Sequence, residues 1–187
     1  MRKFTLPLAV AVFTLASIST LHAASLAGVT LPDTAQVAGK TLVLNGLGLR
    51  TKFVVKVYVA GLYLDQKSSD PDAIIKSDAP KQIVMKFLHA ASKKQMTDAF
   101  DESFNDNAPD AEKTMKADIN QLLGALDSVK VGDQMVFTYV SGTGTTLTIN
   151  GNQKVTIAGS AFGPVLFSVW LGPKPPNPEL KKGMLGQ

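Results

Sequence analysis

The chain has 187 residues, a formal net charge of +4 and no cysteine. The absence of cysteine excludes disulfides, a thiol nucleophile and thiolate metal sites, and we expect neither a metal nor a cofactor. The lysines are scattered along the chain instead of forming a basic stripe, so we expect no nucleic-acid binding.

The N-terminal segment, residues 1–23, has the composition of a secretory signal. A basic start precedes an uncharged stretch over 6–21, and Ala23 and Ala24 are small residues that suit a signal peptidase. The uncharged stretch is shorter than the roughly 20 apolar residues that a spanning helix needs. We therefore predict cleavage after Ala23, export to the periplasm, and a mature domain over 24–187 with no stable membrane anchor. An uncleaved membrane anchor is the alternative.

The first part of the mature chain predicts mainly strands. Residues 25–40 predict an entry strand and a loop, and 41–44 form a short apolar run. The sequence Asn45-Gly46-Leu47-Gly48 predicts a glycine-rich turn. The following segment, 52–64, is rich in Val, Tyr and Phe and predicts a long strand. A short helix from Pro71 to Lys76 and a strand over 82–88 come next.

Helices are predicted in the middle of the chain. Ser92 and Gln95 form a capping box, which predicts a helix that ends near Asn105. One face of this helix carries Met96, Phe100, Ser103 and Phe104. Pro109 predicts the start of another helix, whose apolar stripe extends to Leu126.

Strands and then helices are predicted in the last third of the chain. A strand over 134–140 and a turn over 141–144 precede two strands, 145–149 and 153–158, which flank Asn150-Gly151, a signal for a type I′ hairpin. An apolar helix over 161–171 and a short helix over 178–185 follow. The order of strands, helices, strands and helices predicts an α+β fold with a largely antiparallel sheet.

Arg50 is the first candidate for a binding residue. It lies between two apolar strand segments, where a guanidinium needs an anionic or polar partner. Its planar fork suits a carboxylate or a phenolate oxygen. The alternative, which spacing alone favours, is a structural arginine that pairs with an Asp or Glu or lies at a turn.

Three other residue types could contribute to a site. Tyr58 and Tyr63 are an odd number of residues apart, so a regular strand places them on opposite faces, and one of them could face a cavity. His89 is the one histidine outside the predicted signal, which argues against a metal cluster or a catalytic triad and favours a structural or surface role. Trp170 lies in an apolar helix and either packs in the core or lines an apolar cavity.

Two segments resemble the chalcone isomerase-like family. Residues 45–64 contain Gly-x-Gly-x-Arg followed by a strand that reaches Gly-x-Tyr-Leu, similar to the N-terminal signature of that family. Residues 168–175 and 180–186 resemble the end of its bacterial, exported branch. The resemblance spans roughly residues 27–186. It implies an open-faced β-sandwich, in which helices cover one side of a large antiparallel sheet.

The resemblance also implies roles for particular residues. Plant chalcone isomerases close a flavanone ring by adding a phenolate to an enone, while plastid relatives bind fatty acids. Both use the arginine that corresponds to Arg50. The other catalytic positions fall at Tyr58, near Met96 and Ser103, and near Val169, so the polar groups of the plant enzymes are largely replaced here.

We therefore expect an exported, non-catalytic protein that binds a small apolar anion, such as a fatty acid, in an apolar cleft. The expected ligand-binding residues are Arg50, Tyr58, Met96, Ser103 and Val169. One alternative is an isomerase or intramolecular lyase of the chalcone isomerase type. Another is a structural or interaction module in which Arg50 is ion-paired within the protein. The sequence leaves the ligand and the oligomeric state open.

Overall fold

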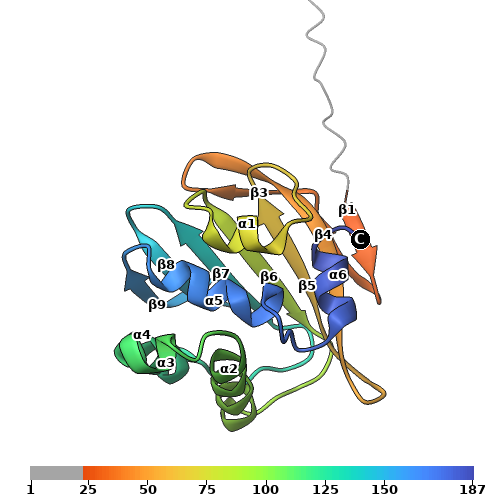
Figure 1. The fold of residues 1–187 in the computed structure, drawn as a ribbon. Coiled ribbons are helices and arrows are strands. Elements are labelled where there is room, and N and C mark those ends of the chain that lie inside the picture. The colour runs from red at the N-terminus through yellow and green to blue at the C-terminus, as the bar shows by residue number, and fades with distance from the viewer. Residues whose placement is uncertain (1–22) are drawn as a thin grey trace, which may run out of the picture.

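The computed structural model describes residues 23–187, so the predicted signal segment lies outside the described residues except for Ala23. The main feature is a seven-stranded antiparallel sheet in which each strand pairs with its neighbours in the sequence (Figure 1). Its strands are β3 (Thr34–Val37), β4 (Lys40–Lys52), β5 (Val55–Leu64), β6 (Lys81–Phe87), β7 (Gln134–Val140), β8 (Gly144–Ile149) and β9 (Asn152–Ala158).

Helices cover one face of this sheet (Figure 1). They are α1 (Pro71–Lys76), α2 (Lys93–Asn107), α3 (Ala111–Thr114), α4 (Lys116–Ala125), α5 (Phe162–Leu171) and α6 (Pro178–Met184). The larger apolar core lies between the helices and the sheet and includes the fully buried Trp170, Phe104 and Phe137. The predicted α+β fold, with an antiparallel sheet covered by helices on one side, is confirmed. None of the helices in residues 23–187 has the length and apolar character needed to cross a bilayer.

A second, smaller core lies on the opposite face of the sheet. Val29 and Leu31 belong to a separate two-stranded sheet and pack with Val59 and Tyr63 of β5. That small sheet consists of β1 (Ala23–Leu26) and β2 (Val29–Pro32). The expected entry strand and loop over 25–40 therefore form three short strands. The sequence patterning missed them because each has only four residues.

The predicted glycine-rich turn at Asn45-Gly46-Leu47-Gly48 is wrong, because β4 continues through it. A Cβ atom at Gly46 would collide with the carbonyl oxygen of Gly183, and one at Gly48 with that of Leu180. Both carbonyls belong to α6, so these glycines allow the α6 backbone to lie directly on β4. The actual turn between β4 and β5 lies at Phe53-Val54.

The helix predicted from Pro109 to Leu126 is divided into α3 and α4. The backbone N–H and the hydroxyl of Thr114 both bond to the carbonyl of Asp110. Met115 then leaves the helical region, with φ of −125°, and α4 begins at the next residue. A hydroxyl that bonds to the preceding turn competes with regular helix geometry, and the apolar periodicity does not reveal this effect.

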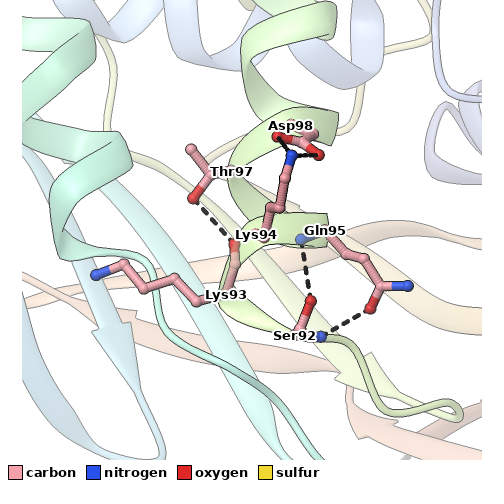
Figure 2. Close-up of polar contacts among 6 residues, drawn as sticks. All are labelled: Ser92, Lys93, Lys94, Gln95, Thr97 and Asp98. Carbon is pink, nitrogen blue, oxygen red and sulfur yellow. Dashed lines mark hydrogen bonds and ion pairs between the residues drawn. The ribbon is translucent and has the colours of Figure 1, made fainter.

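Other local predictions are confirmed. In Figure 2 the Ser92 hydroxyl accepts a hydrogen bond from the backbone N–H of Gln95, and the Gln95 side chain accepts one from the N–H of Ser92. This capping box starts α2 as predicted. Asn150 and Gly151 have φ of 49° and 79°, as a type I′ turn requires.

Candidate functional site

A cleft of about 430 Å³ lies between α2, the β4–β5 hairpin and the C-terminal end of α5. Its size is within the usual range for small-molecule sites, roughly 300–1,000 Å³. All five residues predicted for ligand binding line this cleft: Arg50 from β4, Tyr58 from β5, Met96 and Ser103 from α2, and Val169 from α5. The fold thus brings together side chains that are up to 119 positions apart in the chain.

The inner wall of the cleft is apolar and aromatic. Met85 and Phe87 contribute from β6, Phe100 from α2 and Trp170 from α5, and all four are buried. The rings of Phe100 and Trp170 meet edge to face with centroids 5.7 Å apart. Tyr58 contacts Phe87 in the same way, also at 5.7 Å. This wall suits an apolar ligand, since aromatic rings provide large apolar contact areas.

Arg50 and Tyr58 are direct neighbours across the β4–β5 pair. The guanidinium carbon of Arg50 lies 6.0 Å from the centre of the Tyr58 ring. Arg50 lies on the same face of β4 as Gly46 and Gly48, because the three alternate along the strand. The helix α6 covers the two glycines. Arg50, two residues after Gly48 on β4, is half-buried beside the cleft.

The guanidinium of Arg50 forms no ion pair with an Asp or Glu among residues 23–187. The ion pairs in this part of the chain involve lysines, namely Lys94, Lys154, Lys174 and Lys182. A half-buried cation without a protein carboxylate attracts an anion from outside the chain. The alternative in which Arg50 is neutralised by an acidic side chain of this domain is therefore not what the structure shows.

The Tyr58 hydroxyl is held in place by Trp170. It accepts a hydrogen bond of 3.1 Å from the indole Nε1 of Trp170, and both residues are buried. Burial raises the pKa of Tyr58, and the charge of Arg50 and the Trp170 hydrogen bond offset this only in part. The phenol is therefore neutral at physiological pH and keeps a proton that it can donate to an acceptor in the cleft.

Tyr63 lies on the opposite face of β5, as the spacing predicted. Its hydroxyl donates to the carbonyl of Pro32 at 2.8 Å, and it belongs to the smaller core. Burial and, to a lesser extent, the negative charge of Asp33 raise the pKa of Tyr63 to about 12. Tyr58 is therefore the tyrosine of the candidate site, and Tyr63 has a structural role.

The outer part of the cleft is polar. Asp98 and Glu102 on α2 are exposed there, together with Lys52 and His89. Asp98 is paired with Lys94 at 2.7 Å, four residues before it on the helix (Figure 2). The described residues contain no group of three His, Asp or Glu side chains that could hold a metal ion.

Three residues of the cleft, Trp170, Phe87 and Phe100, were not among the expected ligand-binding residues. The indole of Trp170 both packs in the core and lines the cleft, so the two alternatives considered for it hold together. A buried indole N–H needs a hydrogen-bond acceptor, and this requirement could have indicated that Trp170 contacts a polar group. It did not identify Tyr58 as that group. Phe87 and Phe100 could not be distinguished from ordinary core residues.

Comparisons with known proteins agree with this architecture. A family model described as chalcone isomerase-like matches residues 23–186. A crystal structure of a fatty-acid binding protein from Arabidopsis thaliana superposes with a TM-score of 0.68 at 12% sequence identity, covering 88% of this chain and 96% of that one. No curated protein sequence matches the chain. On the evidence of the family match over nearly all of the described residues, this chain belongs to the chalcone isomerase-like family.

Proposed function

We propose that this protein binds a small apolar carboxylate, such as a fatty acid, in the cleft between α2 and the β4–β5 hairpin. The ligand carboxylate contacts the guanidinium of Arg50 and the hydroxyl of Tyr58. The observation that carries the proposal is that Arg50, half-buried at an apolar cleft, has no carboxylate partner among residues 23–187. The similarity in fold to a fatty-acid binding protein supports the same ligand class.

Two contributions would provide the affinity. Bonds from a guanidinium to a carboxylate are charge-assisted and stronger than bonds between neutral groups. The alkyl chain would lie against Met96, Phe100 and Val169, where burial of each methylene contributes roughly 0.8 kcal/mol. The neutral Tyr58 hydroxyl adds one donor, and Trp170 restricts its orientation.

The composition of the wall supports binding over ring closure. An isomerase of the chalcone type must stabilise the charge that develops on the ketone oxygen, which requires several hydrogen-bond donors. Met96 and Val169 line the cleft and have no side-chain donor. Among the positions that the resemblance assigns to the catalytic groups, the hydroxyls of Tyr58 and Ser103 are the donors that remain. We also propose that binding takes place in the periplasm, since residues 1–23 have the composition of a secretory signal.

Calorimetric titration with a long-chain fatty acid tests the proposal. We expect the wild-type protein to bind the acid and to bind its methyl ester much more weakly. Arg50→Ala should weaken binding of the acid by about ten- to a hundredfold, as expected for loss of a charged hydrogen-bond donor. Lys40→Ala is the matched control, because it removes one positive charge at the other end of β4.

The result can contradict the proposal in two ways. If Arg50→Ala binds the acid as tightly as the wild type does, the guanidinium is not the anchor. If the methyl ester binds as tightly as the free acid, the cleft does not select a carboxylate.

A further inference from the structure

Large apolar side chains are exposed at one end of the sheet. Phe53 and Val54 form the tip of the β4–β5 hairpin and are 95% and 96% exposed. Val131 is also exposed and lies in the loop before β7. The N–H of the next residue, Gly132, donates to the carbonyl of Phe87, the last residue of β6. The hairpin projects beyond the rest of the sheet at the lower right of Figure 1.

The fold itself gains little from this tip. Phe53 has φ of 55°, in the left-handed region, which is unfavourable for a bulky side chain. Three other tight turns of residues 23–187 place a small or polar residue at such a φ, namely Ala27, Ala38 and Asn150, and each is followed by a glycine at a positive φ. At the β4–β5 turn a bulky aromatic residue takes up such a conformation and then points into solvent. A contact outside the chain would account for both features.

The residues around the tip are basic. Lys52 and Lys56 flank Phe53 and Val54, and both lysines are exposed. Arg50 lies two residues before Lys52 on the same strand. No Asp or Glu occurs between residues 34 and 64. The hairpin itself therefore combines an apolar tip with flanking positive charges, while the acidic Asp98 and Glu102 line the cleft from α2. An apolar tip with flanking lysines complements a surface that is apolar inside and negatively charged outside.

We propose that the β4–β5 tip inserts reversibly into the surface of an anionic lipid bilayer. Phe53 and Val54 enter the boundary between headgroups and acyl chains, while Lys52 and Lys56 contact anionic headgroups. A protein partner fits the tip less well, because a specific protein interface buries roughly 1,200–2,000 Å² and a two-residue turn offers only a small part of that area.

The position of the tip relates this contact to the cleft. Lys52, Phe53 and Val55 belong to the hairpin end and also line the cleft that contains Arg50 and Tyr58. A tip in the bilayer would therefore hold the cleft mouth against the lipid. If the proposed function is right, an apolar carboxylate passes between bilayer and cleft without crossing water. The insertion itself does not depend on that function.

Sedimentation with vesicles tests the insertion. The probes are vesicles of phosphatidylcholine mixed with phosphatidylglycerol and vesicles of phosphatidylcholine alone. The wild type should bind the anionic vesicles, and more weakly the neutral ones. Val54→Asp should reduce the partition coefficient by at least about tenfold, and Lys56→Gln by about fivefold. The matched controls, Thr143→Asp and Lys40→Gln, make the same charge changes at the opposite end of the sheet and should bind like the wild type.

A second variant separates insertion from folding. Phe53→Asn places a residue that tolerates positive φ at the tip, so it should bind vesicles at least about tenfold more weakly while its stability is equal or greater. Absence of wild-type binding to anionic vesicles, or wild-type binding by Val54→Asp, would overturn the proposal. It would also be overturned if the wild type sediments as a dimer in solution and Val54→Asp as a monomer, because the tip would then contact a second copy.

The same preparations distinguish this proposal from the proposed function. Val54 does not line the cleft, so Val54→Asp should still bind a long-chain fatty acid in solution. Vesicle binding by a protein that binds no fatty acid would leave the insertion valid and the proposed function wrong. Fatty-acid binding without vesicle binding would give the opposite conclusion.

Discussion

Tyr58 and Tyr63 show how one strand gives the same residue type two roles. Both hydroxyls have a hydrogen-bond partner in the protein, but only Tyr58 lines the cleft. The hydroxyl of Tyr58 accepts a bond from Trp170 and keeps its proton free, whereas that of Tyr63 donates its proton to the carbonyl of Pro32. Loss of the Tyr58 hydroxyl leaves the buried indole N–H of Trp170 without its acceptor, whereas loss of the Tyr63 hydroxyl frees the carbonyl of the exposed Pro32. Only the first loss should affect a ligand.

We predict that Tyr58→Phe lowers the free energy of unfolding by about 1–3 kcal/mol, because the buried indole N–H of Trp170 loses its acceptor. It should also weaken binding of a fatty acid about threefold to tenfold, the loss of one neutral hydrogen bond. Urea unfolding and calorimetry measure the two effects. Tyr63→Phe is the control and should lower stability without changing affinity. Equal affinity losses in both variants would remove Tyr58 from the site.

At the scale of the element, α6 and β4 form a close backbone contact. The Asn45 side chain donates to the carbonyls of Ser68 and Met184 at 2.9 Å each, which ties β4 to the end of α6. Gly46 and Gly48 then remove the side chains that would separate helix from strand. This contact places α6 over Gly46 and Gly48 and leaves Arg50, two residues after Gly48, half-buried beside the cleft.

We predict that Gly48→Ala lowers the free energy of unfolding by about 1–3 kcal/mol, because the new Cβ would overlap the α6 backbone at Leu180. Gly124→Ala is the matched control. Nothing lies within 4 Å of its Cβ position in α4, so it should raise stability by roughly 0.5–1 kcal/mol. Chemical denaturation of both variants checks this prediction. A Gly48→Ala protein as stable as the wild type would show that α6 does not lie directly on β4.

Sequence motifs correctly predicted those elements that depend on interactions between residues close together in the chain. The Ser92–Gln95 box and the Asn150-Gly151 turn are determined by bonds and dihedral angles within a few residues, and both were predicted correctly. The glycines at 46 and 48 were assigned to a turn because turns are the usual local reason for glycine. Their actual cause is a helix more than 130 positions away, which no local pattern contains.

At the scale of the whole molecule, the buried Lys81 has consequences for the pH dependence of stability. The ammonium of Lys81 donates to the carbonyl of Ser77 and lies 4.8 Å and 5.3 Å from the ring centres of Tyr139 and Phe167. Burial lowers the pKa of Lys81 from 10.5 to about 8, although the charges of Asp78 and Asp65 oppose the shift. Between these pH values the unfolded chain binds more protons at this position than the folded one.

Stability should therefore rise with pH from about 8 to 10, since the folded state no longer buries a charge. Above pH 10 a second group opposes this rise in stability. Burial and Asp78 raise the pKa of Tyr139 to about 12, so this tyrosine ionises more readily in the unfolded chain, which lowers the free energy of unfolding. Urea unfolding at several pH values should show this rise in the wild type and in Lys116→Met, an exposed control. A rise of the same size in Lys81→Met would contradict it.

The site combines segments from the whole molecule, and the sequence predicted it only in part. The local pattern singled out Arg50 and left Tyr58 or Tyr63 as a cavity residue, and the resemblance added Met96, Ser103 and Val169. All five expected ligand-binding residues line one cleft. The pairing of Arg50 with Tyr58 depends on the β4–β5 register, which includes two irregular positions that periodicity cannot reveal. The bond from Trp170 to Tyr58 joins residues 112 positions apart and follows only from the packing of α5 on the sheet.

Native mass spectrometry of the protein purified from its own cells tests the central claim most directly. We predict that the wild type carries an additional mass that dissociates as a long-chain carboxylate, and that Arg50→Ala carries little or none. The mass of the chain itself would also show whether residues 1–23 have been removed. Equal amounts of bound carboxylate in the wild type and Arg50→Ala would contradict the account, as would a wild type purified with no bound lipid that also fails to bind added fatty acid.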